Sequence, residues 1–211
     1  MLDRLTLRGG LFTLVINNGG RVVLQNSQVL NSSFHGVFVD DGAVRLQNTT
    51  VDGHPGSGVF AWVGSTVRMG NSIIQNTGNV GLALHHGATA QVGGGSRFTS
   101  NRFGVGLYFG AILHLQDATV ENSIFAGVIA TGGSVALLSG SLIRTNGGDG
   151  IILSDTSVVG FEGGTGQIIN NGGFGIHCSG PPAVAQISTG LGGIGTVSGN
   201  AAGQIACPIS P

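Results

Sequence analysis

The chain is poor in charge and contains no lysine. Charged residues make up 8% of its 211 residues, against roughly 25% in an average soluble domain. All eight basic residues are arginines, the net charge is −1, and neither sign of charge forms a run. Nucleic-acid binding requires clustered basic residues, so we expect no nucleic-acid partner.

Long apolar segments are also missing. No stretch of about 18 uninterrupted apolar residues occurs, which is the length that a membrane-spanning helix needs. The first ten residues, MLDRLTLRGG, lack the apolar core of a signal peptide. The sequence therefore predicts no membrane span.

Glycine, in contrast, is abundant and regularly spaced. Of the 41 glycines, one recurs at steps of 22 to 25 residues, at Gly36, Gly58, Gly81, Gly104, Gly127, Gly150 and Gly175. Between two of these glycines, residues 104–126 hold three short runs in which apolar residues alternate with others. Such alternation, bounded by Gly, Asn or Asp, predicts three brief β-strands per unit and no helix.

Each predicted strand supplies one column of apolar side chains, because residues i and i+2 of a strand share a face. The first column is Val37/Val39, Val59/Ala61, Leu82/Leu84, Val105/Leu107, Val128/Ala130, Ile151/Leu153 and Ile176/Cys178. The second is Val44/Leu46, Val67/Met69, Ala90/Val92, Leu113/Leu115 and Val135/Leu137, and the third is Val29, Val51, Ile74, Phe98, Val120, Leu142 and Ile168. One unit cannot bury three faces alone, but stacked units can, as in a solenoid.

A polar column supports the same repeat. Asparagines stand between the third strand and the glycine that restarts the unit, at Asn31, Asn76, Asn101, Asn122, Asn146, Asn170 and Asn200. Asn tolerates the αL conformation, and its amide can bond the backbone of a turn. We therefore expect a structural ladder of amides at this turn and no ligand site.

With the pattern apolar-x-apolar, Asn, Gly-apolar-x-apolar along nearly its whole length, the sequence resembles the right-handed parallel β-helix family. This family includes pectate lyases, polygalacturonases and phage tailspikes. The resemblance implies an all-β, right-handed parallel β-helix of about nine coils with three short strands per coil, as one domain spanning 1–211. The polar cap over the first coil is expected to be missing. The last coils, GIHCSG and VSGNAAGQIAC, look most like secreted bacterial repeat proteins, which implies an extracellular or cell-surface location.

The two cysteines, Cys178 and Cys207, occupy equivalent positions in the last two predicted coils. Their backbones should lie about 4.8 Å apart, within the range that a disulfide accepts. We predict a Cys178–Cys207 disulfide, which would clamp the terminal coil and imply an oxidising compartment. Two buried free thiols are the alternative, because side chains in parallel register can be poorly oriented for bonding.

The outward positions of the first strand are rich in aromatic residues. One outward row is Phe38, Phe60, Ala83, Gly106, Ile129, Ile152 and His177, and the next is Asp40, Trp62, His85, Tyr108, Thr131, Ser154 and Ser179. Aromatic rings with polar edges, spaced along a groove, suit sugar rings. We predict a glycan-binding strip formed by Phe38, Asp41, Phe60, Trp62, His86 and Phe109.

Two other interpretations of these rings stay open. The rings can pack against neighbouring side chains, or the apolar members can form the interface of a homo-oligomer. The outward row of the second strand is Val23, Arg45, Arg68, Gln91, His114, Ala136 and Val159. Arg45 and Arg68, one coil apart, either pair with Asp40 and Asp41 or bind a carboxylated or sulfated sugar.

Catalysis, if it occurs, would be that of a polysaccharide lyase or a glycoside hydrolase. A glycosidase needs two carboxyl groups about 5 to 9.5 Å apart. Asp40 and Asp41 are adjacent in one coil and should diverge, and Asp155 follows five coils later, about 24 Å away. The polygalacturonase relatives carry a Gly-His-Gly one coil after their Asp pair, whereas Gly53-His54-Pro55 lies in the same coil as Asp41. The acid/base candidates are Asp40, His85, Tyr108 and Arg68.

No metal site is predicted. A pectate-lyase-like Ca²⁺ site needs six to eight oxygen ligands, and only Asp40, Asp41 and Asp52 are available near the candidate strip. We expect no cofactor, with Ca²⁺ as the alternative.

The sequence thus predicts an extracellular β-helix whose aromatic and charged strip binds polysaccharide and, in an extended version of the hypothesis, processes it. The alternative is a non-catalytic stalk or an oligomerising segment of a secreted adhesin or tailspike-like protein.

Overall fold

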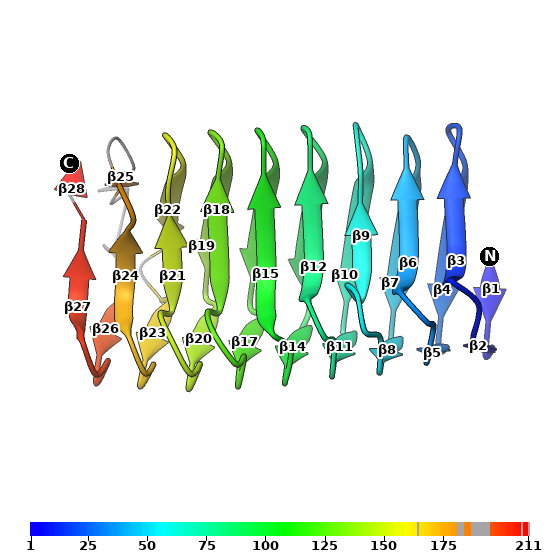
Figure 1. Cartoon of the computed structure of the whole chain (residues 1–211), viewed down its shortest axis with the longest axis horizontal. Coiled ribbons are helices and arrows are strands. Elements are labelled where there is room, and N and C mark those ends of the chain that lie inside the picture. Colours follow the sequence, from blue (N-terminus) through cyan, green and yellow to red (C-terminus); the bar gives the residue numbers. More distant parts are fainter. Residues whose placement is uncertain (164, 181–183, 187–194, 208, 211) are drawn as a thin grey trace.

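The computed structural model describes residues 1–163, 165–180, 184–186, 195–207 and 209–210. In this part of the chain the regular elements are β-strands, wound into a rod along which three parallel sheets run (Figure 1). Within the same residues, no helix has the length and apolar character needed to cross a membrane. The predicted all-β, right-handed parallel β-helix with three short strands per coil is confirmed.

The three sheets are named here by their places in Figure 1. The front sheet consists of β3 (Phe12–Asn17), β6 (His35–Asp40), β9 (Val59–Ala61), β12 (Val80–His85), β15 (Phe103–Tyr108), β18 (Val128–Thr131), β21 (Ile151–Leu153), β24 (Phe174–Cys178) and β27 (Gly203–Ala206). The rear sheet consists of β1 (Leu2–Asp3), β4 (Arg21–Gln25), β7 (Ala43–Gln47), β10 (Thr66–Gly70), β13 (Thr89–Gly93), β16 (Ile112–Gln116), β19 (Val135–Ser139), β22 (Val158–Glu162), β25 (Val184–Gln186) and β28 (Ile209–Ser210). The base sheet consists of β2 (Thr6–Arg8), β5 (Gln28–Leu30), β8 (Thr50–Asp52), β11 (Ile73–Gln75), β14 (Arg97–Thr99), β17 (Thr119–Glu121), β20 (Leu142–Arg144), β23 (Gln167–Ile169) and β26 (Thr196–Ser198).

The front and rear sheets face each other, and the short base sheet closes one edge (Figure 1). The first predicted column lines the interior: Val37, Leu82 and Val105 are fully buried. These residues belong to one core that runs from coil to coil. Side chains on the outer faces of the front and rear sheets therefore point away from each other.

The predicted register is wrong by one residue in β19, β20 and β22. Leu113 pairs with Ala136 and Leu115 with Leu138, so Ala136 and Leu138 are buried in place of the expected Val135 and Leu137. The segment Val135-Ala136-Leu137-Leu138 is apolar at all four positions, so alternation cannot identify its inner face, and a slip of one residue reverses every side chain.

The same slip affects the adjoining positions. Ile143, and not Leu142, pairs with Val120 and fills the core. Ala136 and Val159, which were expected to face outward, are buried, and Leu137 and Gly160 take the outward row instead.

The recurring glycines are required by the close approach of successive coils. A Cβ atom at Gly36, Gly81 or Gly104 would lie 2.5 to 2.6 Å from the carbonyl oxygen of the equivalent glycine in the next coil. Real Cβ atoms do not come so close to a carbonyl oxygen, so a side chain here would push the coils apart. Glycine therefore recurs once per coil because the packing of successive coils leaves no room for a side chain at this position.

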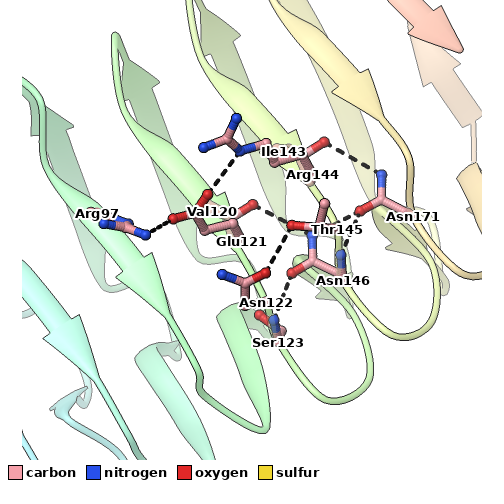
Figure 2. Close-up of polar contacts among 10 residues, drawn as sticks. All are labelled: Arg97, Val120, Glu121, Asn122, Ser123, Ile143, Arg144, Thr145, Asn146 and Asn171. Carbon is pink, nitrogen blue, oxygen red and sulfur yellow. Dashed lines mark hydrogen bonds and ion pairs between the residues drawn. The ribbon is translucent and has the colours of Figure 1, made fainter. Parts of the chain in front are cut away.

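The turn between the base and front sheets holds the expected ladder, but the predicted asparagine column divides into two. Asn101, Asn146 and Asn200 are buried and bond neighbouring coils; between Asn146 and Asn200 stands Asn171, which the sequence analysis missed. Asn146 Nδ2 donates to Asn171 Oδ1 at 2.9 Å (Figure 2). The other predicted members, Asn31, Asn76, Asn122 and Asn170, stand one residue before the ladder, are exposed, and adopt positive φ angles of 53° to 57°.

The disulfide between Cys178 and Cys207 is confirmed, with the two Cα atoms 4.9 Å apart. It joins the end of β24 to the residue after β27, in adjacent coils of the front sheet. The spacing of a parallel sheet thus supplies the separation that a disulfide needs.

Candidate functional site

The predicted strip forms a continuous aromatic surface on the outer face of the front sheet. We call it the aromatic wall, and its rings are Phe12, Phe34, His35, Phe38, Phe60, Trp62, His85, His86, Tyr108 and Phe109. Trp62, His85 and Tyr108 lie in one row as predicted, since His85 pairs with Tyr108 and the Trp62 and His85 ring centroids are 5.2 Å apart. Phe12, Phe34 and His35 were not predicted to belong to it.

Most rings of the wall stack on one another. The centroid of His85 lies 4.4 Å from that of Tyr108 with an interplanar angle of 21°, and 4.8 Å from that of Phe60 with an angle of 26°. This spacing follows from the separation of about 4.8 Å between parallel strands, which brings in-register rings into contact. Neighbouring rings thus cover one another's faces.

Phe109 differs from the rings beside it because, among the described residues, no ring of the next coil stacks on it. It is 58% exposed and stacks on His86 with centroids 4.9 Å apart. The turn in the following coil carries Gly132, and a Cβ there would lie 3.2 Å from Phe109 Cδ1. The absence of a side chain at Gly132 leaves this side of Phe109 open as a platform.

Burial keeps two histidines of the wall, His35 and His85, neutral. Burial, with His54 nearby, lowers the pKa of His35 to about 4, and its Nδ1 accepts a hydrogen bond from the backbone N–H of Ser57 at 2.8 Å. Burial, with the neighbouring His86 and His35, lowers the pKa of His85 to about 4.

The pKa of Tyr108 moves in the opposite direction. It is raised by burial, so the phenol stays protonated at neutral pH. Among the described residues, His85 Nδ1 is buried without a hydrogen-bond partner. A neutral imidazole thus lies against a protonated phenol.

The predicted acid/base group is divided between two walls. Asp40, His85 and Tyr108 belong to strands of the front sheet, whereas Arg68 lies in β10 of the rear sheet. Because the outer faces of these sheets point apart, Arg68 cannot act together with the other three residues on one bound sugar.

Arg45 and Arg68 pair in register one coil apart, as predicted. Within the described residues, no Asp or Glu side chain forms an ion pair with either guanidinium, so the expected pairing with Asp40 or Asp41 is not formed. The two arginines border a hollow of about 550 Å³, which we call the rear groove and whose lining includes Gln47, Gln91, Gly93, His114 and Gln116.

A buried carboxylate on the base sheet was missed by the sequence analysis. The Glu121 side chain is 3% exposed and lies between Arg97 and Arg144, its neighbours in the adjoining coils (Figure 2). Arg144 Nε donates to Glu121 Oε2 at 2.8 Å, and Arg97 pairs with Oε1. The signal in the sequence was the single glutamate flanked by arginines at steps of one coil.

In its row of the described base sheet, Glu121 has no carboxylate close enough for glycoside hydrolysis. Asp52 lies in the same row but three coils away, which is about 14 Å and beyond the 9.5 Å limit. Asp52 also accepts hydrogen bonds from Gln75 and Asn76. The Arg97–Glu121–Arg144 triad is therefore a lateral clamp on three coils.

His54, the histidine of the Gly-His-Pro segment, is a member of the buried turn ladder. Its Nδ1 accepts a hydrogen bond from the Ser32 backbone N–H at 3.1 Å, and its Nε2 donates to the Val29 carbonyl at 3.1 Å. The equivalent Asn101 bonds the Ile74 carbonyl in the same way. Burial lowers the pKa of His54, so it serves as a neutral structural side chain.

In the described ranges, no group of three or more His, Cys, Asp and Glu side chains gathers as a metal site. The aspartates considered for Ca²⁺ are separated: Asp40 ends β6 on the front sheet, Asp41 is in the following turn with φ 48°, and Asp52 ends β8 on the base sheet.

Comparison with known proteins supports the architecture. The A-module of the Azotobacter vinelandii mannuronan C-5 epimerase AlgE4 is similar over 96% of this chain and 62% of its own, with a TM-score of 0.64 and 13% identity. The periplasmic alginate epimerase AlgG is similar over 92% of this chain and 51% of its own, with a TM-score of 0.58 and 13% identity. At this identity the likeness is one of fold, and the chain spans less than two thirds of either neighbour.

Among curated protein sequences, none matches this chain significantly. Residues 2–138 match the model of a family described as the right handed beta helix region. This match covers more than half of the sequence and agrees with the three parallel sheets and their one-coil register. The chain therefore belongs to the right-handed β-helix family.

Proposed function

We propose that this chain is a polysaccharide-binding β-helix that acts outside the cytoplasm, with the aromatic wall as its binding surface. The observation that carries the proposal is the in-register row from Trp62 to Tyr108 beside the open platform of Phe109. Both structural neighbours are named as epimerases of polysaccharides, mannuronan and alginate. The disulfide supports an oxidising location.

The wall offers two kinds of contact to a sugar chain. The open face of Phe109 can pack against the apolar face of a pyranose ring. The ring edges of Trp62 and Tyr108 supply N–H and O–H groups for sugar hydroxyls, and the carboxylates of Asp40 and Asp41 accept hydrogen bonds. A linear glycan lying along the rod axis would meet these groups in succession.

The test is binding of soluble polysaccharides by affinity gel electrophoresis, starting from a glycan array to find the ligand. We expect Trp62→Ala and Phe109→Ala each to weaken retention at least about fivefold, since an aromatic contact contributes about 1 kcal/mol or more. The matched control is Phe125→Ala, which removes a ring of similar exposure, 46%, outside the wall. Retention that is equal in all three variants would contradict the proposal.

The glycan screen, together with a mass measurement under native conditions, separates the competing roles. A native mass equal to one chain would argue against the homo-oligomer, whereas absence of any glycan ligand would leave the stalk. Binding without turnover would identify a non-catalytic module.

A second candidate is a polysaccharide lyase reaction at the same wall, favoured by the contact between His85 and Tyr108. Neutral His85 would take the proton from the sugar carbon next to a carboxylate. The C–O bond at the neighbouring carbon would break as a C=C double bond forms, and Tyr108 would give its proton to the leaving oxygen. The wall supports glycoside hydrolysis less well than the lyase reaction, because the described front sheet places no second carboxyl group opposite Asp40.

Turnover can be followed by the ultraviolet absorbance of the unsaturated product. We expect Tyr108→Phe to remove turnover while retaining binding, since it deletes only the hydroxyl. His85→Ala should remove turnover as well. Residual turnover in both variants at the original rate would overturn this second candidate and leave the binding function intact.

A further inference from the structure

The rear groove lies on a stretch of the rear sheet, β4 to β19, whose strands carry arginines and no acidic residue. Strands β4 to β19 of the rear sheet contain Arg21, Arg45 and Arg68, three of the eight arginines, and neither Asp nor Glu. We propose that the rear groove is a second binding site, independent of the aromatic wall, for an acidic polysaccharide carrying carboxylate or sulfate groups.

The pairing of Arg45 with Arg68 is the first argument. The two residues are direct partners in adjacent parallel strands, and both side chains are exposed. Like charges directly opposite each other in a sheet destabilise it. An anion between the two guanidiniums would relieve this repulsion, and planar guanidinium groups bind carboxylate and sulfate through two parallel hydrogen bonds.

The shape of the groove is the second argument. Gly70 and Gly93 stand in the row that elsewhere carries Gln47 and Gln116. The Gln47 side chain reaches over Gly70, where its Oε1 would lie 2.6 Å from a Cβ, whereas the space above Gly93 is open, so the wall is hollowed at Gly93 between the two glutamine side chains. Arg45, Arg68, Gln91 and His114 follow one another at one-coil steps beside it. This row spans three steps, about 14 Å, so the site fits an extended chain along the rod axis.

The chemistry of the lining favours a saccharide over single-stranded nucleic acid. Proteins that bind single strands stack the bases on aromatic side chains, and the lining of the rear groove contains neither Phe, Tyr nor Trp. The amides of Gln47, Gln91 and Gln116 can donate to and accept from hydroxyl groups. Guanidinium and amide groups together match a chain that alternates acidic groups with hydroxyls.

The test is isothermal titration of the 211-residue chain at low ionic strength with four probes of similar length: an oligouronate from alginate, a heparin oligosaccharide, a neutral glucan oligosaccharide and oligothymidine. The decisive variant is R45Q/R68Q, which introduces the residue already present at Gln91 in this row. The charge-matched control is R8Q/R102Q, which removes two arginines outside the groove.

We expect at least one acidic oligosaccharide to bind the unmodified chain, and the neutral glucan not to compete with it. R45Q/R68Q should weaken that binding at least about tenfold and R8Q/R102Q less than about twofold, because only the first pair contacts the anion. Whether the uronate or the heparin probe binds more tightly distinguishes carboxylate from sulfate recognition.

A second variant tests the groove by occupancy and charge. A Cβ at Gly93 would make only ordinary contacts, 3.4 Å from the Gln116 carbonyl oxygen, so Gly93→Glu should fold. Its carboxylate would fill the hollow and repel an anion, and we expect it to weaken acidic-oligosaccharide binding as much as R45Q/R68Q does.

The outcomes separate this proposal from that for the aromatic wall. Binding that survives Trp62→Ala and Phe109→Ala but not R45Q/R68Q supports the rear groove by itself. Absence of acidic-oligosaccharide binding, equal weakening in both arginine double variants, or tighter binding of oligothymidine than of either acidic probe would overturn it.

Discussion

The aromatic wall and the rear groove are built from the same repeat but differ in whether their side chains satisfy one another. On the front sheet, one-coil spacing places the ring centroids of His85 and Tyr108 4.4 Å apart, and the stacked rings stabilise each other. On the rear sheet, the same spacing places Arg45 beside Arg68, and the charges repel. Stacked rings stabilise the fold without any ligand. Stacked like charges repel each other, and a bound anion would remove that repulsion.

The base sheet shows the same spacing with alternating charge. Glu121 stands between Arg97 and Arg144 and is neutralised by both (Figure 2). This row needs no outside partner, because its charges are paired within the fold. The contrast with Arg45 and Arg68 is what identifies the rear groove as the unsatisfied surface.

The largest expected loss of stability comes from removing the central charge of the Arg97–Glu121–Arg144 triad. Glu121→Gln removes the buried negative charge and leaves Arg97 and Arg144 without a counter-charge. We expect the free energy of unfolding to fall by about 2 to 3 kcal/mol. This is less than the roughly 3 to 5 kcal/mol for a fully buried pair, because Arg97 and Arg144 are 47% and 44% exposed. Urea unfolding measures this, with the exposed Glu162→Gln as the control. Equal stability of the two variants would contradict the paired state of the triad.

An intermediate change in the free energy of unfolding is expected when the pH is lowered until His35 and His85 of the aromatic wall become protonated. The pKa of both His35 and His85 is about 4 in the folded chain, against an ordinary value of 6.5. Between pH 6.5 and 4 the unfolded chain binds protons that the folded chain excludes, so the free energy of unfolding should fall as pH decreases. Above pH 6.5 neither histidine contributes a pH dependence.

The size of this effect is at least about 1 kcal/mol for each histidine, with the smaller value expected for His85, whose partly exposed ring is screened by solvent. Urea unfolding at pH 7.5 and 4.5 gives the total change, to which His54 also contributes. The double variant His35→Phe/His85→Phe should show a smaller pH dependence of the free energy of unfolding, because the contribution of these two histidines is removed. An unchanged pH dependence in that variant would contradict the assignment.

The smallest expected effect is on the stability of the rear wall. Arg68→Glu would place a carboxylate next to Arg45 and so reproduce the charge pattern of the base sheet. We expect the free energy of unfolding to rise by about 0.5 kcal/mol, because both residues are exposed. Thermal unfolding at low salt measures this, with Arg102→Glu as the control. A loss of stability in Arg68→Glu would argue that Arg68 has a partner within the fold.

Much of the fold could be predicted because, in a parallel β-helix, equivalent residues of successive coils recur at a nearly constant interval in the sequence. The glycine column, the first apolar column and the Cys178–Cys207 pair all follow from residues that recur once per coil. The register at Val135 to Leu138 could not be predicted, because four consecutive apolar residues carry no alternation.

The candidate site was predictable only row by row. The order Asp40, Trp62, His85, Tyr108 was confirmed as a row of the front sheet. How that row relates to Arg68 depends on the turn between two sheets, which the alternation within strands does not encode. His54 was similarly ambiguous, because a buried histidine in a turn ladder has the same sequence signature as an exposed one.

The sequence alone determined the period of the chain, which residues lie above one another, and which face of most strands is buried, because these depend on spacing along a regular backbone. The tertiary structure decided which rows share a wall, whether rings present faces or edges, and whether charges meet a counter-charge. Those properties depend on how the turns orient the three sheets and on the directions of individual side chains, and neither is a function of distance along the sequence.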